Sequence, residues 1–138
     1  MFRTLFAALS YFLVVFSVAF VLGALRAFLF APLLGVSIAI ALEVPIVLVF
    51  SWFVCRAIIV RMNVPANSAH RLVMGTAAFA LLMVAEAALA SVLLGHTLSQ
   101  HLASYQNPIG LCGLAAQIVF ALLPFLQLAW YSPSRRPI

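Results

Sequence analysis

The chain has 138 residues, of which 67% are hydrophobic and only 7% are charged. A soluble domain carries roughly a quarter of charged residues, because its surface must be hydrated. A chain this poor in charge is stable only where most of its surface faces lipid, so the composition excludes a soluble protein. The net charge of +5 comes entirely from arginines that flank apolar runs. We therefore expect the lipid bilayer as a partner and no contact with nucleic acid.

Four apolar stretches each approach the ~20 residues that a helix needs to cross the hydrocarbon layer. They predict helices over residues of about 5–30, 36–60, 71–94 and 109–130, followed by a polar tail at 131–138. The first stretch is too long for the apolar core of a secretory signal, so we interpret it as a membrane span. The sequence predicts an all-α integral membrane protein: a single domain over 1–138, a bundle of four transmembrane helices made of two antiparallel hairpins.

Turn-forming residues separate these stretches. Pro32 and Gly35 predict a very short turn after the first, and Asn67 or Ser68 is expected to cap the third helix. The longest polar stretch, 95–108, is predicted to be a loop.

The arginines indicate the orientation of the chain in the membrane. With four spans, Arg26 lies toward one side and the other six fall on the opposite side: Arg3, Arg56, Arg61, Arg71, Arg135 and Arg136. Short cytoplasmic segments carry the excess of basic residues. We therefore expect both termini in the cytoplasm of a bacterial inner membrane, with the segment 95–108 facing outward.

Polar residues within the spans form a predicted layer toward the outer side. Arg26 and Glu43 lie at equal distances from the first turn, about 8.5 residues or ~13 Å along each helix, so an ion pair between them is expected. In the second hairpin Glu86 precedes Gly95, and Gln117 follows Pro108, by the same number of residues. The predicted intramembrane layer therefore consists of Arg26, Glu43, Glu86 and Gln117.

The layer holds two carboxyls but one arginine. Because low-dielectric surroundings disfavour an unpaired charge, we expect one of the two carboxyls to be protonated. Two interpretations follow. Either the layer is structural and fixes the register of the helices, or one glutamate binds and releases a proton.

Two prolines and a run of small residues modify the helices. Pro45 leaves the carbonyl of Ala41, and Pro124 the carbonyl of Phe120, without its usual helical donor. Ala87, Ser91 and Gly95 recur at four-residue spacing in the third helix, a pattern that predicts close packing near the polar layer or a dimer interface.

No motif indicates catalysis, a metal or a cofactor. His96 and His101 lie in the outer loop without a nearby carboxylate or cysteine, whereas a metal site needs three or four converging ligands. Serines lack the setting of an activated nucleophile. The sequence therefore predicts a non-enzymatic membrane protein without metal or cofactor.

Two functions remain open. The first is an accessory or assembly subunit, whose partner is another membrane protein or a second copy of the chain. The alternative is a small, oligomeric proton- or cation-coupled transporter with Glu86 or Glu43 as the titrating group. A water-filled cavity that reaches the glutamates would favour the transporter, and a dry, fully paired cluster would favour the accessory subunit.

Overall fold

A computed structural model describes residues 1–130 of the chain, so the predicted tail with Arg135 and Arg136 lies outside the described residues. The described part is helical and contains no strand. Its elements are α1 (Phe2–Leu25), the π-helical turn η1 (Arg26–Phe30), α2 (Ala31–Leu34), α3 (Val36–Arg61), α4 (Ser68–Leu94), α5 (Leu98–Ser104) and α6 (Pro108–Ala129). Four helical stretches are long and apolar enough to cross a membrane: Phe2–Leu34, Val36–Arg61, Ser68–Leu94 and Pro108–Ala129.

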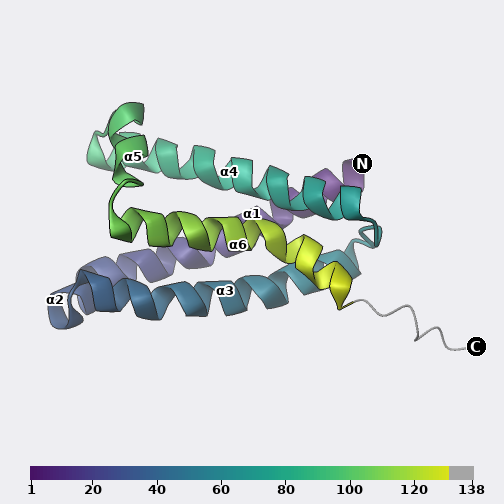
Figure 1. The fold of residues 1–138 in the computed structure, drawn as a ribbon, viewed down its shortest axis with the longest axis horizontal. Coiled ribbons are helices and arrows are strands. Elements are labelled where there is room, and N and C mark those ends of the chain that lie inside the picture. Colours follow the sequence, from purple (N-terminus) through teal and green to yellow (C-terminus); the bar gives the residue numbers. More distant parts are fainter. Residues whose placement is uncertain (131–138) are drawn as a thin grey trace, which may run out of the picture.

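The four long helices form a ring in which each packs on two others. Helix α1 packs on α3 and α4, and α6 packs on the same two helices, so α1 faces α6 across the ring and α3 faces α4. The N-terminus and the α3–α4 connection lie at one end of the long axis in Figure 1, and α2 and α5 lie at the other. We call these two ends of the bundle the N-terminal end and the α2 end.

The first predicted helix differs from the observed one at its C-terminal boundary. Pro32 lies inside α2 rather than in a turn, and only Gly35, with φ +86°, separates α2 from α3. Proline cannot donate to the carbonyl of residue 28, and the chain accommodates this with the wide turn η1, where the Ala31 N–H bonds the Arg26 carbonyl. Helical conformation therefore continues to Leu34, and the π turn begins at Arg26.

The predicted outer loop contains the short helix α5. The Thr97 side chain accepts a hydrogen bond from the Gln100 N–H (3.3 Å), and the Gln100 side chain accepts one from the Thr97 N–H (2.9 Å). This reciprocal capping starts α5 within the stretch that the sequence predicts to be a loop.

At the start of α4, Asn67 is the residue that caps the helix, since its side chain accepts a hydrogen bond from the Ala69 N–H at 2.8 Å.

The core of the bundle crosses the ring from α1 to α6. Tyr11 is fully buried, and its ring stacks on that of Phe120 with 4.4 Å between centroids. Its hydroxyl donates to the Phe120 carbonyl at 3.0 Å. This is the carbonyl that Pro124 leaves without a helical donor, so a side chain of the opposite helix supplies the missing hydrogen bond.

A close approach of α4 to α6 occurs at Gly75. A Cβ added there would lie 1.9 Å from the carbonyl oxygen of Ala121, so only glycine fits. The expectation of close packing at the small-residue run is wrong for contacts within residues 1–130, because Ser91 is exposed and a Cβ at Gly95 would meet nothing within 4 Å. Gly95, with φ +65°, instead ends α4 in a left-handed conformation.

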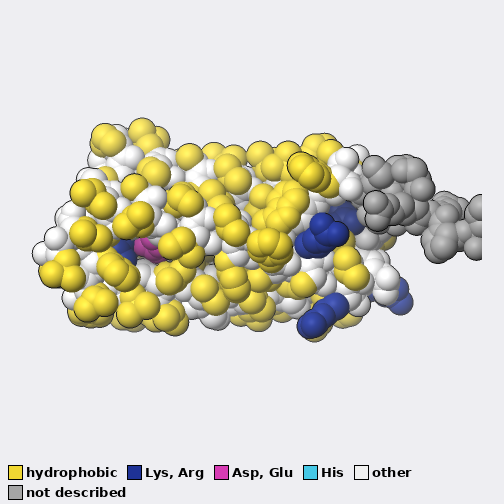
Figure 2. All heavy atoms as spheres, turned by 90° about the horizontal axis from the view of Figure 1, so that it is seen from below, with side chains coloured by type: hydrophobic (Ala, Val, Ile, Leu, Met, Phe, Trp, Pro, Cys, Tyr) yellow, Lys and Arg dark blue, Asp and Glu magenta, His cyan; other side chains and the backbone are white. Residues whose placement is uncertain are grey.

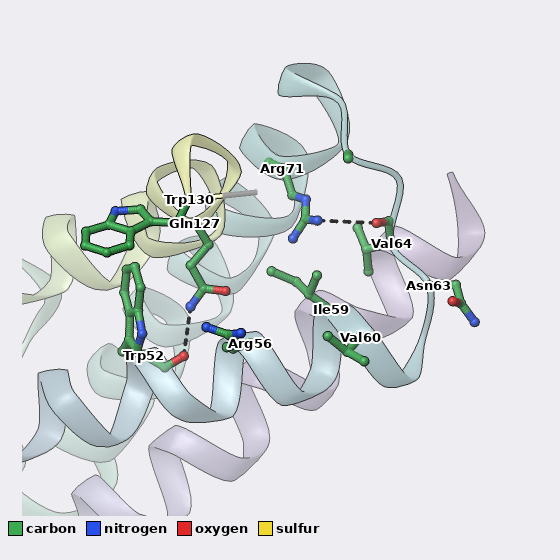
Figure 3. A pocket seen from close by; sticks show the side chains of 10 residues that line it. Trp52, Arg56, Ile59, Val60, Asn63, Val64, Arg71, Gln127 and Trp130 are labelled. Carbon is green, nitrogen blue, oxygen red and sulfur yellow. Dashed lines mark hydrogen bonds between the residues drawn. The ribbon is translucent and has the colours of Figure 1, made fainter. Parts of the chain in front are cut away.

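Polar contacts join the helices at the N-terminal end (Figure 3). The side-chain amide of Gln127 donates to the backbone carbonyl of Trp52 at 2.8 Å, and the rings of Trp52 and Trp130 meet edge to face at 6.1 Å between centroids. Arg71 is buried, and its Nε donates to the Pro65 carbonyl at 3.2 Å. Arg56 and Arg71 line a cavity of about 410 Å³ among these groups.

Figure 2 shows one face of the molecule, most of which is covered by hydrophobic side chains. Basic side chains gather toward the N-terminal end, and an acidic group is visible among apolar side chains toward the α2 end. The described acidic residues are Glu43 and Glu86. This face therefore has a wide apolar surface between a basic N-terminal end and a site toward the α2 end where a basic group lies beside the acidic one, a distribution typical of helical membrane proteins.

Replacing Gly75 with alanine is expected to destabilise the fold by about 1–3 kcal/mol, because the added methyl group forces α4 and α6 apart. Thermal unfolding in detergent measures the change. Gly113→Ala is the matched control, since a Cβ at Gly113 meets nothing within 4 Å and alanine favours the helix. Equal melting temperatures for Gly75→Ala and the wild type would contradict the close approach.

Candidate functional site

The first polar pair joins η1 to α3. Nη1 of Arg26 lies 2.9 Å from Oε2 of Glu43, with 34% of the arginine side chain and 15% of the glutamate side chain exposed. A Cβ at Gly23 would lie 3.9 Å from both Nη2 of Arg26 and Oε1 of Glu43. Gly23 of α1 therefore lies directly beside the pair.

The second polar pair joins α4 to α6. The side-chain amide of Gln117 donates to Oε2 of Glu86 at 2.6 Å. Within residues 1–130 no arginine or histidine forms a salt bridge with Glu86. The two glutamates therefore have different partners, a cation for Glu43 and neutral donors for Glu86.

Two residues at the end of the short helix α5 extend the second pair outward. The Tyr105 hydroxyl donates to Oε2 of Glu86 at 3.2 Å and lies 3.3 Å from Nε2 of His101. The His101 and Tyr105 rings meet edge to face with 5.3 Å between centroids. With its proton on Nε2, the imidazole donates to Tyr105 and Tyr105 donates to Glu86. A chain of hydrogen bonds then leads from the half-exposed His101 to the glutamate.

Tyr105 remains a neutral donor over a wide pH range. Burial, together with the nearby Glu86 carboxylate and its hydrogen bond, raises the pKa of Tyr105 to about 12. All three causes disfavour the phenolate. The hydroxyl proton is therefore held in the chain between His101 and Glu86 at physiological pH.

A half-open pocket of about 700 Å³ borders both pairs, and we call it the cavity. All four long helices contribute to its lining, and Arg26, Glu43, Glu86 and Gln117 all border it. The remaining lining residues are apolar and include the rings of Phe16, Phe20, Phe28 and Phe120. Phe120 also stacks on Tyr11, so this stack lies at the boundary between the cavity and the filled part of the core.

The structure brings the four predicted polar residues to one cavity, in two pairs. Sequence reasoning missed the roles of Tyr105 and His101, because it treated their segment as a loop. The pattern Thr97-Leu-Ser-Gln100 is a capping box and predicts a helix start. In that helix, residues 101 and 105 are one turn apart and face the same side.

The histidines and cysteines form no ligand cluster in the described part of the chain. No group of three or more His, Cys, Asp or Glu side chains there could hold a metal ion. His70 instead shares a hydrogen bond with the Thr4 hydroxyl at 2.8 Å. The strongly polar groups that line the cavity are two carboxyls, one guanidinium and one amide.

No protein-family model, curated protein or solved structure matches this chain. Functional proposals therefore rest on the residues of the cavity and on their contacts.

Arg26→Ala is expected to lower the stability by about 1–3 kcal/mol, because it leaves the Glu43 carboxylate without its charged partner. Glu43→Gln combined with Arg26→Ala should cost less than the sum of the two single changes. Denaturation of the four proteins in detergent measures this coupling. Additive changes would show that the two side chains do not stabilise each other.

Tyr105 is expected to make stability depend on alkaline pH. Since its pKa is above the ordinary value of 10, its contribution is complete below pH 10 and is lost as the pH rises toward about 12. The difference in melting temperature between the wild type and Tyr105→Phe should therefore shrink between pH 10 and 12. A difference that stays constant across this interval would contradict the shift.

Proposed function

We propose that this chain is a small proton- or cation-coupled membrane transporter in which Glu86 binds and releases the cation. The observation that supports this proposal is the cavity of about 700 Å³ that borders both glutamates. If the polar layer only supported the structure, we would expect its side chains to be closely packed, with no such space between them. Glu86 is favoured over Glu43 because Glu43 already has a cationic partner.

The charges of the layer support a cation rather than an anion as the ligand. Arg26 and Glu43 neutralise each other at 2.9 Å, so an ionised Glu86 leaves a net charge of −1 at the cavity. An uncompensated carboxylate in a low-dielectric region is costly, and a bound proton or other monovalent cation removes that cost. The neutral donors Gln117 and Tyr105 can hold the carboxylate between binding events.

The chain is proposed to work as two antiparallel hairpins, α1–α3 and α4–α6, in a bacterial inner membrane. The arginine excess at the N-terminal end supports cytoplasmic termini, and it leaves α5 and His101 on the outer side. In this orientation the hydrogen-bonded chain from His101 to Glu86 leads inward from the outer face. A second copy of the chain or another membrane protein would be met within the bilayer, because the described loops are short.

A second proposal is a non-enzymatic accessory or assembly subunit in which the polar layer fixes helix register. The Arg26–Glu43 pair supports it, because the pair is charge-neutral and joins the first hairpin at a fixed height. Polar contacts of this kind contribute about 0.6–2 kcal/mol each within membranes. The two proposals differ in whether a carboxyl changes its protonation state.

Infrared difference titration of the reconstituted protein is expected to show a carboxyl band that changes between pH 5 and 9. Glu86→Gln should remove the band because it removes the proposed proton site, and Glu43→Gln should leave it in place. Folding of both variants is checked by their melting temperatures. If neither carboxyl changes over this interval, the transporter proposal is wrong and the accessory subunit is favoured.

A further inference from the structure

We propose that the cavity binds a hydrophobic organic ammonium ion, with its N–H groups on Glu86 and Gln117 and its apolar body among the phenylalanine rings. The inference rests on the proposed function and names the substrate class of the same site. It depends on three features of the cavity: its lining, its charge and its unused hydrogen-bond acceptors.

The lining fits an apolar organic molecule better than a hydrated ion. Only the four layer residues bring strongly polar groups to the cavity, and the remaining lining side chains are apolar. Its volume of about 700 Å³ lies within the ~300–1,000 Å³ typical of sites for small organic ligands. Hard metal cations such as Ca²⁺ and Mg²⁺ require about six oxygen ligands, whereas only Glu43, Glu86 and Gln117 bring side-chain oxygens to these walls and Glu43 is paired with Arg26.

The charge of the cavity and its aromatic rings both favour a cation. Glu86 contributes the charge that Arg26 and Glu43 leave uncompensated. Phe16, Phe20, Phe28 and Phe120 line the same space. The negative faces of such rings attract an organic cation that has been removed from water. An apolar molecule without charge would leave the carboxylate uncompensated.

Two oxygens of residues that line the cavity accept no hydrogen bond from a described side chain. Oε1 of Gln117 is buried and has no hydrogen-bond donor within residues 1–130. Both side-chain hydrogen bonds that Glu86 accepts there end on Oε2, so its other oxygen, Oε1, is not engaged by a described side chain. A buried acceptor without a donor is costly, and an N–H group of the ligand removes this cost. An ammonium ion with at least one N–H therefore fits better than a quaternary ammonium ion, which has none.

Equilibrium dialysis of radiolabelled 2-phenylethylamine against the protein in lipid nanodiscs tests this inference at pH 7. Empty nanodiscs correct for partition into lipid. The ammonium form should bind saturably, and its quaternary trimethyl analogue about tenfold more weakly, because it lacks a charge-assisted hydrogen bond. Neutral 2-phenylethanol should show no saturable binding. Equal binding of the three compounds, or lipid-like partition of all of them, would overturn the inference.

Two variants locate the bound molecule. Glu86→Gln should weaken binding of the amine about tenfold or more, because it removes the charge. Gly113→Leu should abolish binding while the protein stays folded, since Gly113 lines the cavity and a Cβ there meets nothing within 4 Å. Ala115→Leu adds the same bulk to an exposed position of α6 outside the lining and should bind like the wild type. Wild-type binding by Gly113→Leu would place the ligand elsewhere.

The infrared titration separates this inference from the proposed function. If the Glu86 carboxyl titrates but no amine binds saturably, the substrate class is wrong and the site binds protons alone. If the carboxyl does not titrate and no amine binds, both proposals are wrong. Saturable binding that depends on Glu86 and is blocked by Gly113→Leu supports both.

Discussion

The arrangement of this bundle depends on the cost of placing charge in a low-dielectric environment. Two carboxyls and one guanidinium border the same cavity, and the structure gives each carboxyl a different solution. Glu43 has the arginine at 2.9 Å, whereas Glu86 is held by the Gln117 amide and the Tyr105 hydroxyl. Neutral donors stabilise a carboxylate without cancelling its charge. This difference between the two glutamates is the basis for assigning a cation site to Glu86.

The backbone of the helices determines where the bundle is filled and where it is open. Gly75 allows α4 to approach α6 closely, and the Tyr11–Phe120 stack crosses the ring. Pro124 contributes to this stack, because it frees the carbonyl that the Tyr11 hydroxyl uses. Phe120 belongs both to the stack and to the cavity lining, so the filled core and the cavity share one wall. An opening toward the N-terminal end would therefore require Tyr11 or Phe120 to move.

The short helix α5 and its C-cap Tyr105 contact the second polar pair at the α2 end of the bundle. Its capping box fixes the start of the helix, and one turn of helix then aligns His101 with Tyr105. Gly110, whose absent Cβ would lie 1.9 Å from the Ser104 carbonyl oxygen, lets the first turn of α6 approach the end of α5 closely. These contacts hold Tyr105 within reach of Glu86.

The four apolar helices and the separations of the polar residues from the turns follow directly from the sequence. Residues equally far from a short turn lie at similar heights on two packed helices, which is why Arg26 could be matched with Glu43 and Glu86 with Gln117. The free carbonyl of Phe120 also follows from the sequence, since proline has no N–H. Which side chains meet across the ring, such as Tyr11 and Phe120, depends on how the helices pack. The presence of a cavity that borders both pairs depends on the same packing. These helices are apolar on all sides, so no periodic pattern indicates which face is turned toward the neighbours. The contact of Tyr105 with Glu86 also cannot be predicted from the sequence, because it depends on how α5 lies against α4.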